Sequence, residues 1–313
     1  MLVDLVEVTA ADGLRLDGAL YPPQAANSAD AAPTSLAGFD AALIVHGTGS
    51  NFYASRFLGF LADRFTKAGL AALVVNTRGH DQICSALVRH PDGSTGSRTI
   101  GSAYETVDDC RLDLAAWLKL LAERGYRRIA LVGHSLGAVK CVYASVQSAT
   151  DDALRAAFAN DGSPGVGAVV AISPPRLSYE HFSQSVRGPG FLEEHAAAER
   201  LVADGKPEAL MEIRFPLPYV ITAAGYLEKY GRDERYNLLK LVDRLPRPTL
   251  FTFGGLEIQQ GIAFRGFPEA LQDKKDEGAK LNIAVIANGD HNYTLVQSTL
   301  MDTIERWLGK QLN

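Results

Sequence analysis

The segment that most constrains the fold is Gly133–Gly137, which reads Gly-His-Ser-Leu-Gly. It follows a short apolar run, Arg128–Val132, which predicts a buried strand, and it precedes Ala138–Val146, which can form a helix. A chain that turns sharply from a strand into a helix needs small residues two positions before and two positions after the turn residue. The pattern therefore predicts a strand, a sharp turn and a helix, with the Ser135 hydroxyl exposed at the turn as a candidate nucleophile.

Other apolar runs alternate with helical patterns along most of the chain. Strands are expected at residues 41–45, 70–75, 128–132, 166–172, 249–253 and 282–286, and helices at 55–68, 105–123 and 294–308. Continuous apolar strands that alternate with helices are typical of a parallel sheet with right-handed crossovers, so the predicted fold class is α/β. An antiparallel hairpin is expected at 5–9 and 15–21, and the polar stretch 83–103 predicts a long loop.

The alternation stops between Pro174 and Pro246, where helical patterns replace the strands. These patterns lie near residues 191–204, 218–230 and 234–244. The interruption is too long for a simple connection, so we expect a helical cap over the ends of the strands. The predicted organisation is a core domain formed by residues 1–173 and 247–313, with a cap at 174–246 inserted before the penultimate strand.

Composition excludes several classes of partner and of site. The 313 residues carry a formal net charge of -5, so neither nucleic acid nor an anionic membrane surface is an expected partner. The three cysteines, Cys84, Cys110 and Cys141, have no C-x-x-C spacing, which argues against a disulfide framework and a zinc site. The N-terminal residues lack the pattern of a signal peptide, and no apolar run is long enough to span a membrane, so a cytoplasmic location is expected.

A serine hydroxyl becomes a nucleophile at neutral pH only with a base within hydrogen-bond reach. His291 is the best-placed histidine, because it follows the last predicted strand and precedes the last helix, where parallel sheets build their sites. Glu257, just after the predicted strand 249–253, is the candidate acid that would fix the tautomer of the histidine. Asp290 is expected to be structural, and Asp161 is a weaker candidate acid because it precedes its strand.

Negative charge that develops on a carbonyl oxygen needs N–H donors that are already in place. One expected donor is the backbone N–H of Leu136, at the start of the helix after Ser135. The other is expected from Thr48, with Gly49 as the next candidate, in the glycine-rich loop that follows the predicted strand 41–45. We expect contacts with the substrate from Gly47 and Gly49, because glycines let the backbone approach it closely. A further contact is expected from His134, next to Ser135. The loop lacks the spacing of phosphate-binding motifs, so nucleotide binding is not expected.

The order of these features resembles that of the α/β-hydrolase superfamily. His46-Gly47 and Asn76–His80 each follow a predicted strand, and they precede the Gly133–Gly137 turn, Glu257 and His291. The resemblance covers nearly the whole chain except the expected cap, and it implies a mostly parallel central sheet with helices on both faces. It also implies these roles: nucleophile Ser135, base His291, acid Glu257, and oxyanion donors Thr48 and Leu136. The family acid is more often Asp, so Glu257 departs from the common pattern.

The resemblance implies attack on an ester, thioester or amide carbonyl through an acyl-enzyme that water hydrolyses, with no cofactor or metal. The expected function is that of a carboxylesterase for small or medium acyl or aryl esters. Thioesterase, lipase and peptidase activities remain alternatives with the same triad, as do a cofactor-free haloperoxidase and a C–C bond hydrolase. A catalytically silent binding protein on the same fold is the alternative from another class. Such proteins usually lose a triad residue, whereas this chain has candidates for all three.

Overall fold

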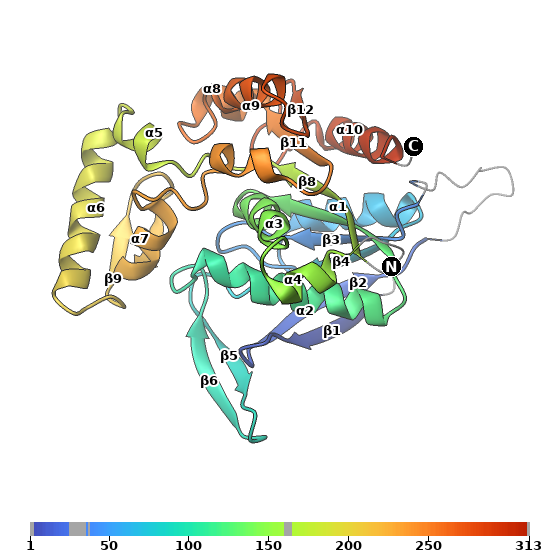
Figure 1. Cartoon of the computed structure of the whole chain (residues 1–313), viewed down its shortest axis with the longest axis horizontal. Coiled ribbons are helices and arrows are strands. Elements are labelled where there is room, and N and C mark those ends of the chain that lie inside the picture. Colours follow the sequence, from blue (N-terminus) through green and yellow to red (C-terminus); the bar gives the residue numbers. More distant parts are fainter. Residues whose placement is uncertain (1–2, 25–35, 37, 160–164, 312–313) are drawn as a thin grey trace, which may run out of the picture.

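The computed structural model describes residues 3–24, 36, 38–159 and 165–311 (Figure 1). Its centre is an eight-stranded sheet in the order β1-β2-β4-β3-β7-β8-β11-β12. The strands are β1 (Asp4–Thr9), β2 (Arg15–Tyr21), β3 (Ala41–Val45), β4 (Ala71–Val75), β7 (Arg128–His134), β8 (Gly165–Ile172), β11 (Thr249–Gly254) and β12 (Leu281–Ile286). β1, β2 and β4 pair antiparallel, and the strands from β4 to β12 in this order pair parallel. The predicted α/β class, with its N-terminal hairpin, is confirmed.

Helices cover both faces of the sheet (Figure 1). α1 (Arg56–Lys67) and α10 (Gln297–Gly309) pack on one face, and α2 (Cys110–Glu123) and α3 (Leu136–Gln147) pack on the other. The shorter core helices are η1 (Val107–Asp109), α4 (Asp152–Ala157), α8 (Gly255–Gln260) and α9 (Phe267–Asp276).

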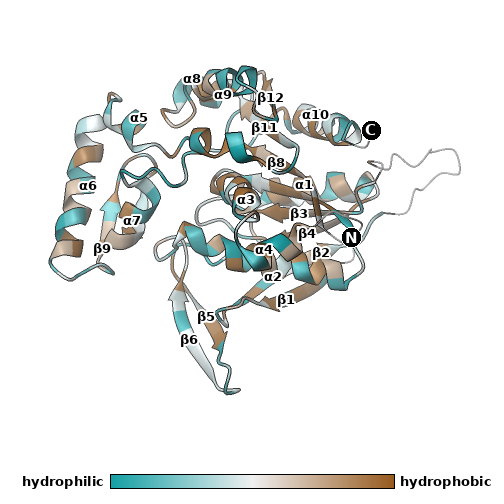
Figure 2. Ribbon diagram, in the orientation of Figure 1, coloured by the Kyte–Doolittle hydropathy of each residue, from teal (hydrophilic) through white to brown (hydrophobic). Residues whose placement is uncertain are grey.

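Burial on both faces explains why the central strands are continuous apolar runs. In β3, Leu43 and Val45 belong to the core beneath α2 and α3, whereas Ala42 and Ile44 belong to the core beneath α1 and α10. All five β3 residues are buried, and the hydrophobic colour of the central strands is visible in Figure 2. Because β3, β7, β8, β11 and β12 pair parallel, their carboxyl ends lie at the same edge of the sheet. The loops and helices of the site follow these strand ends.

The segment between β8 and β11 is referred to below as the insertion (residues 174–246). It contains α5 (Tyr179–Ser183), α6 (Gly188–Ala203), β9 (Leu210–Ile213), β10 (Tyr219–Thr222), α7 (Ala223–Tyr230), η2 (Leu238–Lys240) and η3 (Val242–Arg244). The expected helix at 218–230 is wrong at its start, because residues 219–222 form β10, which pairs with β9 in an antiparallel two-stranded sheet. The Thr222 hydroxyl accepts a hydrogen bond from the Gly225 N–H at 3.1 Å and caps α7, so strand and helix meet inside one apparent helical pattern.

The expectation of a long loop at residues 83–103 is also wrong. β5 (Cys84–Arg89) and β6 (Thr95–Ile100) form an antiparallel hairpin in this stretch. The hairpin projects from the body of the molecule, and five of the six β6 residues are exposed (Figure 1). A strand with so little burial needs no apolar alternation, so its sequence resembles that of a loop.

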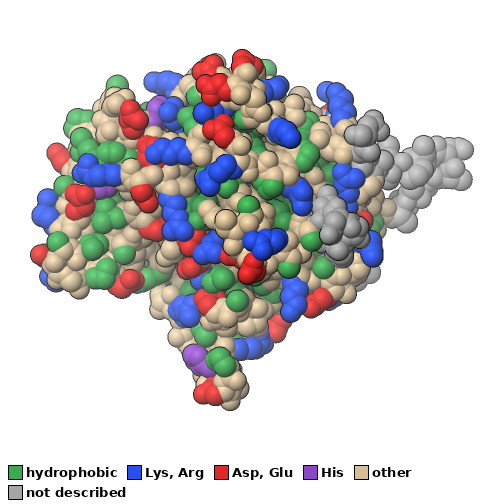
Figure 3. Space-filling view, in the orientation of Figure 1, with side chains coloured by type: hydrophobic (Ala, Val, Ile, Leu, Met, Phe, Trp, Pro, Cys, Tyr) green, Lys and Arg blue, Asp and Glu red, His purple; other side chains and the backbone are tan. Residues whose placement is uncertain are grey.

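Five of the eleven exposed large hydrophobic side chains among the described residues lie in the insertion. Hydrophobic side chains gather over α6 in Figure 3. The exposed large hydrophobic residues of the insertion are Val186, Leu192, Val202, Leu210 and Leu217. Within the described parts of the chain, no helix combines the length and the apolar character needed to cross a membrane.

Candidate active site

Ser135 stands at the turn between β7 and α3 with φ at 57° and ψ at -126°. A positive φ is strained for a residue with a Cβ, and it persists only where the surroundings enforce it. Gly133 and Gly137 make the turn sterically feasible. A Cβ on Gly133 would lie 2.3 Å from the Gly137 carbonyl oxygen, and a Cβ on Gly137 would lie 2.4 Å from that of His46. The Ser135 N–H donates to the Ile172 carbonyl of β8 at 2.8 Å, which anchors the turn to the neighbouring strand.

His291 lies in the loop after β12, and its ring is bonded to a carboxylate. The His291 Nδ1–H donates to Glu257 Oε2 at 2.9 Å. Glu257 stands in the first turn of α8, immediately after β11, and its side chain is 4% exposed, against 39% for His291. A buried carboxylate bound to Nδ1 leaves Nε2 as the ring nitrogen that can exchange a proton with another group.

The second carboxylate oxygen of Glu257 is also held. Glu257 Oε1 accepts hydrogen bonds from the Ser173 hydroxyl at 2.6 Å and from the Gly254 N–H at 2.7 Å. The Ser173 hydroxyl is in turn 2.9 Å from the hydroxyl of buried Tyr293. Sequence reasoning missed Ser173, although it follows β8 directly, as the other site residues follow their strands. These contacts fix the carboxylate orientation, as the polar neighbours of catalytic groups commonly do.

His134 supports His291 through the backbone. The His134 Nε2–H donates to the His291 carbonyl oxygen at 2.8 Å, and the two rings lie 4.8 Å apart. Burial, and then the proximity of His291, lower the pKa of His134 to about 3, so His134 is neutral at physiological pH. Through this hydrogen bond, His134 stabilises the position of the loop after β12.

The loop after β3 approaches Ser135 closely. A Cβ on Gly47 would lie 2.8 Å from the Ser135 Cβ, so only glycine fits at that position. The ring of His46 holds the loop: Nδ1–H donates to the Gly47 carbonyl at 2.7 Å, and Nε2 accepts from the Thr77 N–H at 3.0 Å. Burial, and then the nearby Lys140 charge, lower the pKa of His46 to about 3, and this keeps the ring neutral. Gly49, at φ 62°, completes the turn of the loop.

A cavity of about 270 Å³ lies next to Ser135 and His291. It is lined by Thr48, Ser135, Leu136, Pro175, Leu177, Pro216, Leu217, Tyr230, Ala263, Phe264 and His291. The structure thus brings four of the predicted site residues, Ser135, His291, Thr48 and Leu136, to one cavity, and Glu257 lies behind His291. Gly47, Gly49 and His134 lie beside the cavity but do not line it. No residue of the β5–β6 hairpin lines it either.

Asp290 shapes the turn that carries His291. Asp290 Oδ1 accepts from the N–H groups of Asn292 and Thr294, at 3.0 Å and 2.9 Å, so its carboxylate shapes the turn, in agreement with the structural role expected of it. Asp161 lies outside the described residues.

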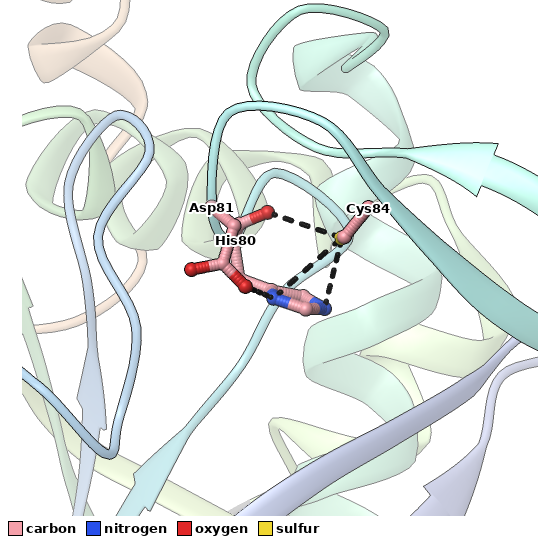
Figure 4. Close-up of side chains that lie close together, drawn as sticks. All are labelled: His80, Asp81 and Cys84. Atoms are coloured by element: carbon pink, nitrogen blue, oxygen red, sulfur yellow. Dashed lines mark hydrogen bonds and ion pairs between the residues drawn. The ribbon is translucent and has the colours of Figure 1, made fainter.

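Among the described residues, one group of metal-ligating residue types has ligand atoms within 4.8 Å of one another: His80, Asp81 and Cys84 (Figure 4). It lies near the loop after β3, since Asp81 contacts Asn51. Cys84 Sγ is 3.9 Å from Nδ1 and 3.8 Å from Nε2 of His80. A sulfur equidistant from both ring nitrogens is far off the lone-pair direction of either one, so the pair does not point at a common ion. Burial, and then Asp81, raise the pKa of the Cys84 thiol, which disfavours the thiolate that a metal requires.

Asp81 has a different role in this group. Its carboxylate accepts hydrogen bonds from Asn51 Nδ2 at 2.7 Å and from the Tyr53 hydroxyl, and it lies 2.9 Å from His80 Nδ1. Asn51 and Tyr53 both lie between β3 and α1. The hydrogen bonds to Asp81 therefore stabilise the connection that begins with the loop after β3.

Comparison with known proteins places this geometry in a family. A model of the alpha/beta hydrolase family matches residues 42–308, from β3 to α10. The chain belongs to the alpha/beta hydrolase family. No curated protein matches the sequence.

Solved structures share the fold at low sequence identity. Est1E from Butyrivibrio proteoclasticus, solved with ferulic acid bound, superposes with a TM-score of 0.62 at 14% identity, over 97% of this chain and 98% of that one. The alpha/beta hydrolase GrgF from Penicillium sp. sh18 gives 0.62 at 17% identity, over 100% and 99% of the two chains. The monoacylglycerol lipase of Paleococcus ferrophilus gives 0.58 at 18% identity, over 95% and 99%. The fold of this chain thus has solved counterparts at low sequence identity.

Proposed function

We propose that the protein is a serine hydrolase that cleaves carboxylic esters through an acyl-enzyme on Ser135. The observation that carries the proposal is the cavity that Ser135 and the Glu257-bound His291 line together. Membership of the alpha/beta hydrolase family and the esterases and lipase among its structural counterparts support ester hydrolysis in general. The choice of ester over thioester or amide, and the roles of the residues below, belong to the proposal.

In the proposed mechanism, His291 Nε2 takes the proton of the Ser135 hydroxyl as the oxygen attacks the ester carbonyl carbon. Glu257 holds the Nδ1–H and stabilises the imidazolium that forms. The charge on the carbonyl oxygen is met by the N–H of Leu136, which heads α3 and has no acceptor within the helix, and by a donor from Thr48. His291 then returns the proton to the departing alcohol. A water molecule, deprotonated by the same ring, hydrolyses the acyl-enzyme and releases the acid.

The cavity sets the scale of the substrate. Its volume of about 270 Å³ is just below the range of about 300–1,000 Å³ that holds drug-sized ligands. Most of its lining side chains are apolar, which suits an alkyl or aryl group. Small or medium acyl and aryl esters therefore fit best. The ferulic acid bound to Est1E, a protein of similar fold, is a ligand of this size class.

The test is a panel of p-nitrophenyl esters from acetate to palmitate, assayed with the native protein and with Ser135→Ala. The proposal predicts the highest kcat/KM for short and medium chains and a loss of about 10⁴-fold or more in kcat for Ser135→Ala. Equal turnover by Ser135→Ala would refute the proposal. A native protein that turns over none of the esters but binds them would favour the silent binding protein.

A second candidate, action on aggregated lipid, has one observation in its favour. Leu217 lines the cavity and is 46% exposed, and other large hydrophobic residues of the insertion are exposed as well. An exposed apolar patch is typical of a surface that meets lipid or another protein. The same panel separates the two candidates, because a lipase would turn over palmitate dispersed in micelles faster than dissolved butyrate.

A further inference from the structure

One wall of the cavity has a single polar side chain. That wall consists of Tyr230 and of six apolar residues: Pro175, Leu177, Pro216, Leu217, Ala263 and Phe264. Tyr230 is the last residue of α7 in the insertion and is 5% exposed. Its hydroxyl is therefore the one group on this wall that can form a directional contact with a substrate.

Tyr230 is the end of a buried chain of polar groups. Its hydroxyl lies 3.2 Å from the hydroxyl of Tyr219, which lies 3.3 Å from Lys229 Nζ. The Lys229 side chain is 1% exposed, and its Nζ is 3.8 Å from Glu105 Oε2, which is too long for a hydrogen bond. The Lys229 ammonium thus has the Tyr219 oxygen as its hydrogen-bond acceptor among the described residues.

The two tyrosine hydroxyls can share their hydrogen bond in either direction. An ammonium group only donates, so the Tyr219 oxygen accepts from Lys229, whereas either hydroxyl of the Tyr219–Tyr230 pair can donate to the other. Burial raises the pKa of both Tyr219 and Tyr230, so both hydroxyls keep their protons. An acceptor inside the cavity would select the arrangement in which Tyr219 donates to the Tyr230 oxygen and the Tyr230 O–H donates to that acceptor.

The surrounding charges hold Lys229 in place. Glu105 is 1% exposed and lies between two buried lysines: Lys140 pairs with its Oε1, and Lys229 lies near its Oε2. Burial alone would raise the pKa of Glu105, but Lys140 and Lys229 outweigh burial and hold it below the usual value. Lys229 thus stays near a negative charge while its ammonium donates to the Tyr219 oxygen.

We propose that the Tyr230 hydroxyl, directed by Lys229 through Tyr219, recognises a hydrogen-bond-accepting oxygen in the part of the ester that occupies the insertion end of the cavity. The substrate class is then an ester whose acyl or alcohol group carries a hydroxyl, ether or carbonyl oxygen in addition to the scissile carboxyl. This proposal rests on the proposed ester hydrolysis and adds the chemistry of the group that is selected. Tyr230 is a specificity residue in this account and takes no part in bond cleavage.

The test compares matched esters that differ by one atom. One set consists of p-nitrophenyl hexanoate and its analogues in which an ether oxygen replaces the methylene at C3, C4 or C5 of the acyl chain. The other set consists of hexyl acetate and its analogues with an ether oxygen at C3, C4 or C5 of the alcohol, and their hydrolysis is followed by proton release. Selectivity is the kcat/KM of an ether analogue divided by that of its all-carbon parent. Dividing the selectivity of the native protein by that of Tyr230→Phe cancels the intrinsic reactivity of each ester.

The proposal predicts that this quotient reaches about 3 to 10 for at least one position of the oxygen, the value of one neutral hydrogen bond. Tyr226→Phe is the matched control, because Tyr226 is a buried tyrosine of α7 that does not line the cavity, and its quotient should stay near 1. Lys229→Met should reduce the same selectivity without removing the Tyr230 hydroxyl. A quotient below about 2 at every position in both sets would overturn the proposal. Hexanoate turnover that persists in Ser135→Ala would instead refute the proposed function itself.

Discussion

The substitution Glu257→Gln tests the acid of the proposed triad with little change in shape. Glu257 Oε1 accepts two hydrogen bonds, from the Ser173 hydroxyl and from the Gly254 N–H. A glutamine at this position therefore keeps its carbonyl oxygen at the Oε1 site and turns its amide NH₂ toward His291 Nδ1, where Oε2 now lies at 2.9 Å. An NH₂ group donates, so it favours the histidine tautomer that carries its proton on Nε2.

The size of the effect follows from that tautomer. A ring protonated at Nε2 cannot take the proton of Ser135, and the imidazolium also loses its counter-charge. Loss of this function in serine hydrolases costs about 10⁴-fold in kcat, which corresponds to about 5 kcal/mol of transition-state stabilisation. Folding stability should change by no more than about 1–2 kcal/mol, because Ser173 and Gly254 keep their acceptor. KM should change little, since Glu257 does not line the cavity.

The assay is steady-state hydrolysis of p-nitrophenyl butyrate, combined with a thermal melt to verify folding. Asp290→Asn is the matched control, because asparagine retains the Oδ1 acceptor that Asn292 and Thr294 use. It should retain kcat within about threefold. A nearly active Glu257→Gln together with an inactive Asp290→Asn would refute the assignment of the acid.

Two further predictions concern stability. His46 and His134 are neutral in the folded protein, with pKa values of about 3 instead of 6.5 in the unfolded chain, so the free energy of unfolding falls as the pH drops from 6.5 toward 3. Each of the two histidines should lower the free energy of unfolding by about 2 kcal/mol between pH 7 and pH 5, as measured by urea denaturation. His134→Asn should remove about half of the combined fall, and a free energy of unfolding that does not change between these pH values would contradict the reasoning. Gly133→Ala should destabilise by at least about 3 kcal/mol or prevent folding, because its Cβ would meet the Gly137 carbonyl. Gly59→Ala on α1, where a Cβ meets nothing within 4 Å, should be neutral or slightly stabilising, and equal melting temperatures for the two variants would count against the account of the turn.

The central sheet could be predicted from the sequence because its parallel strands are buried on both faces. Ala41–Val45 is apolar at every position for that reason, and its predicted bounds coincide with β3. The β5–β6 hairpin escaped prediction because Thr95–Thr99 is exposed, so no apolar alternation marks it. The β9–β10 pair escaped because each strand has only four residues and β10 leads directly into α7.

The candidate site was predictable to the extent that its residues follow strands. Ser135, Glu257 and His291 all come after strands of the parallel sheet, and the edge that these strands share brings them together. Ser173 has the same placement, but a lone serine carries no motif. The chain from Lys229 to Tyr230 could not be predicted, since it depends on how α7 packs against β10 and on Glu105 from another part of the chain.

The central claim, that Ser135 is the nucleophile of an acyl-enzyme, is tested most directly by intact-mass spectrometry after reaction with a fluorophosphonate, followed by peptide mapping. The account predicts one adduct per chain, located on the peptide that contains Ser135 and absent from Ser135→Ala. Glu257→Gln should label much more slowly while it remains folded. An adduct on another residue, or labelling of Ser135→Ala at the native rate, would contradict the account.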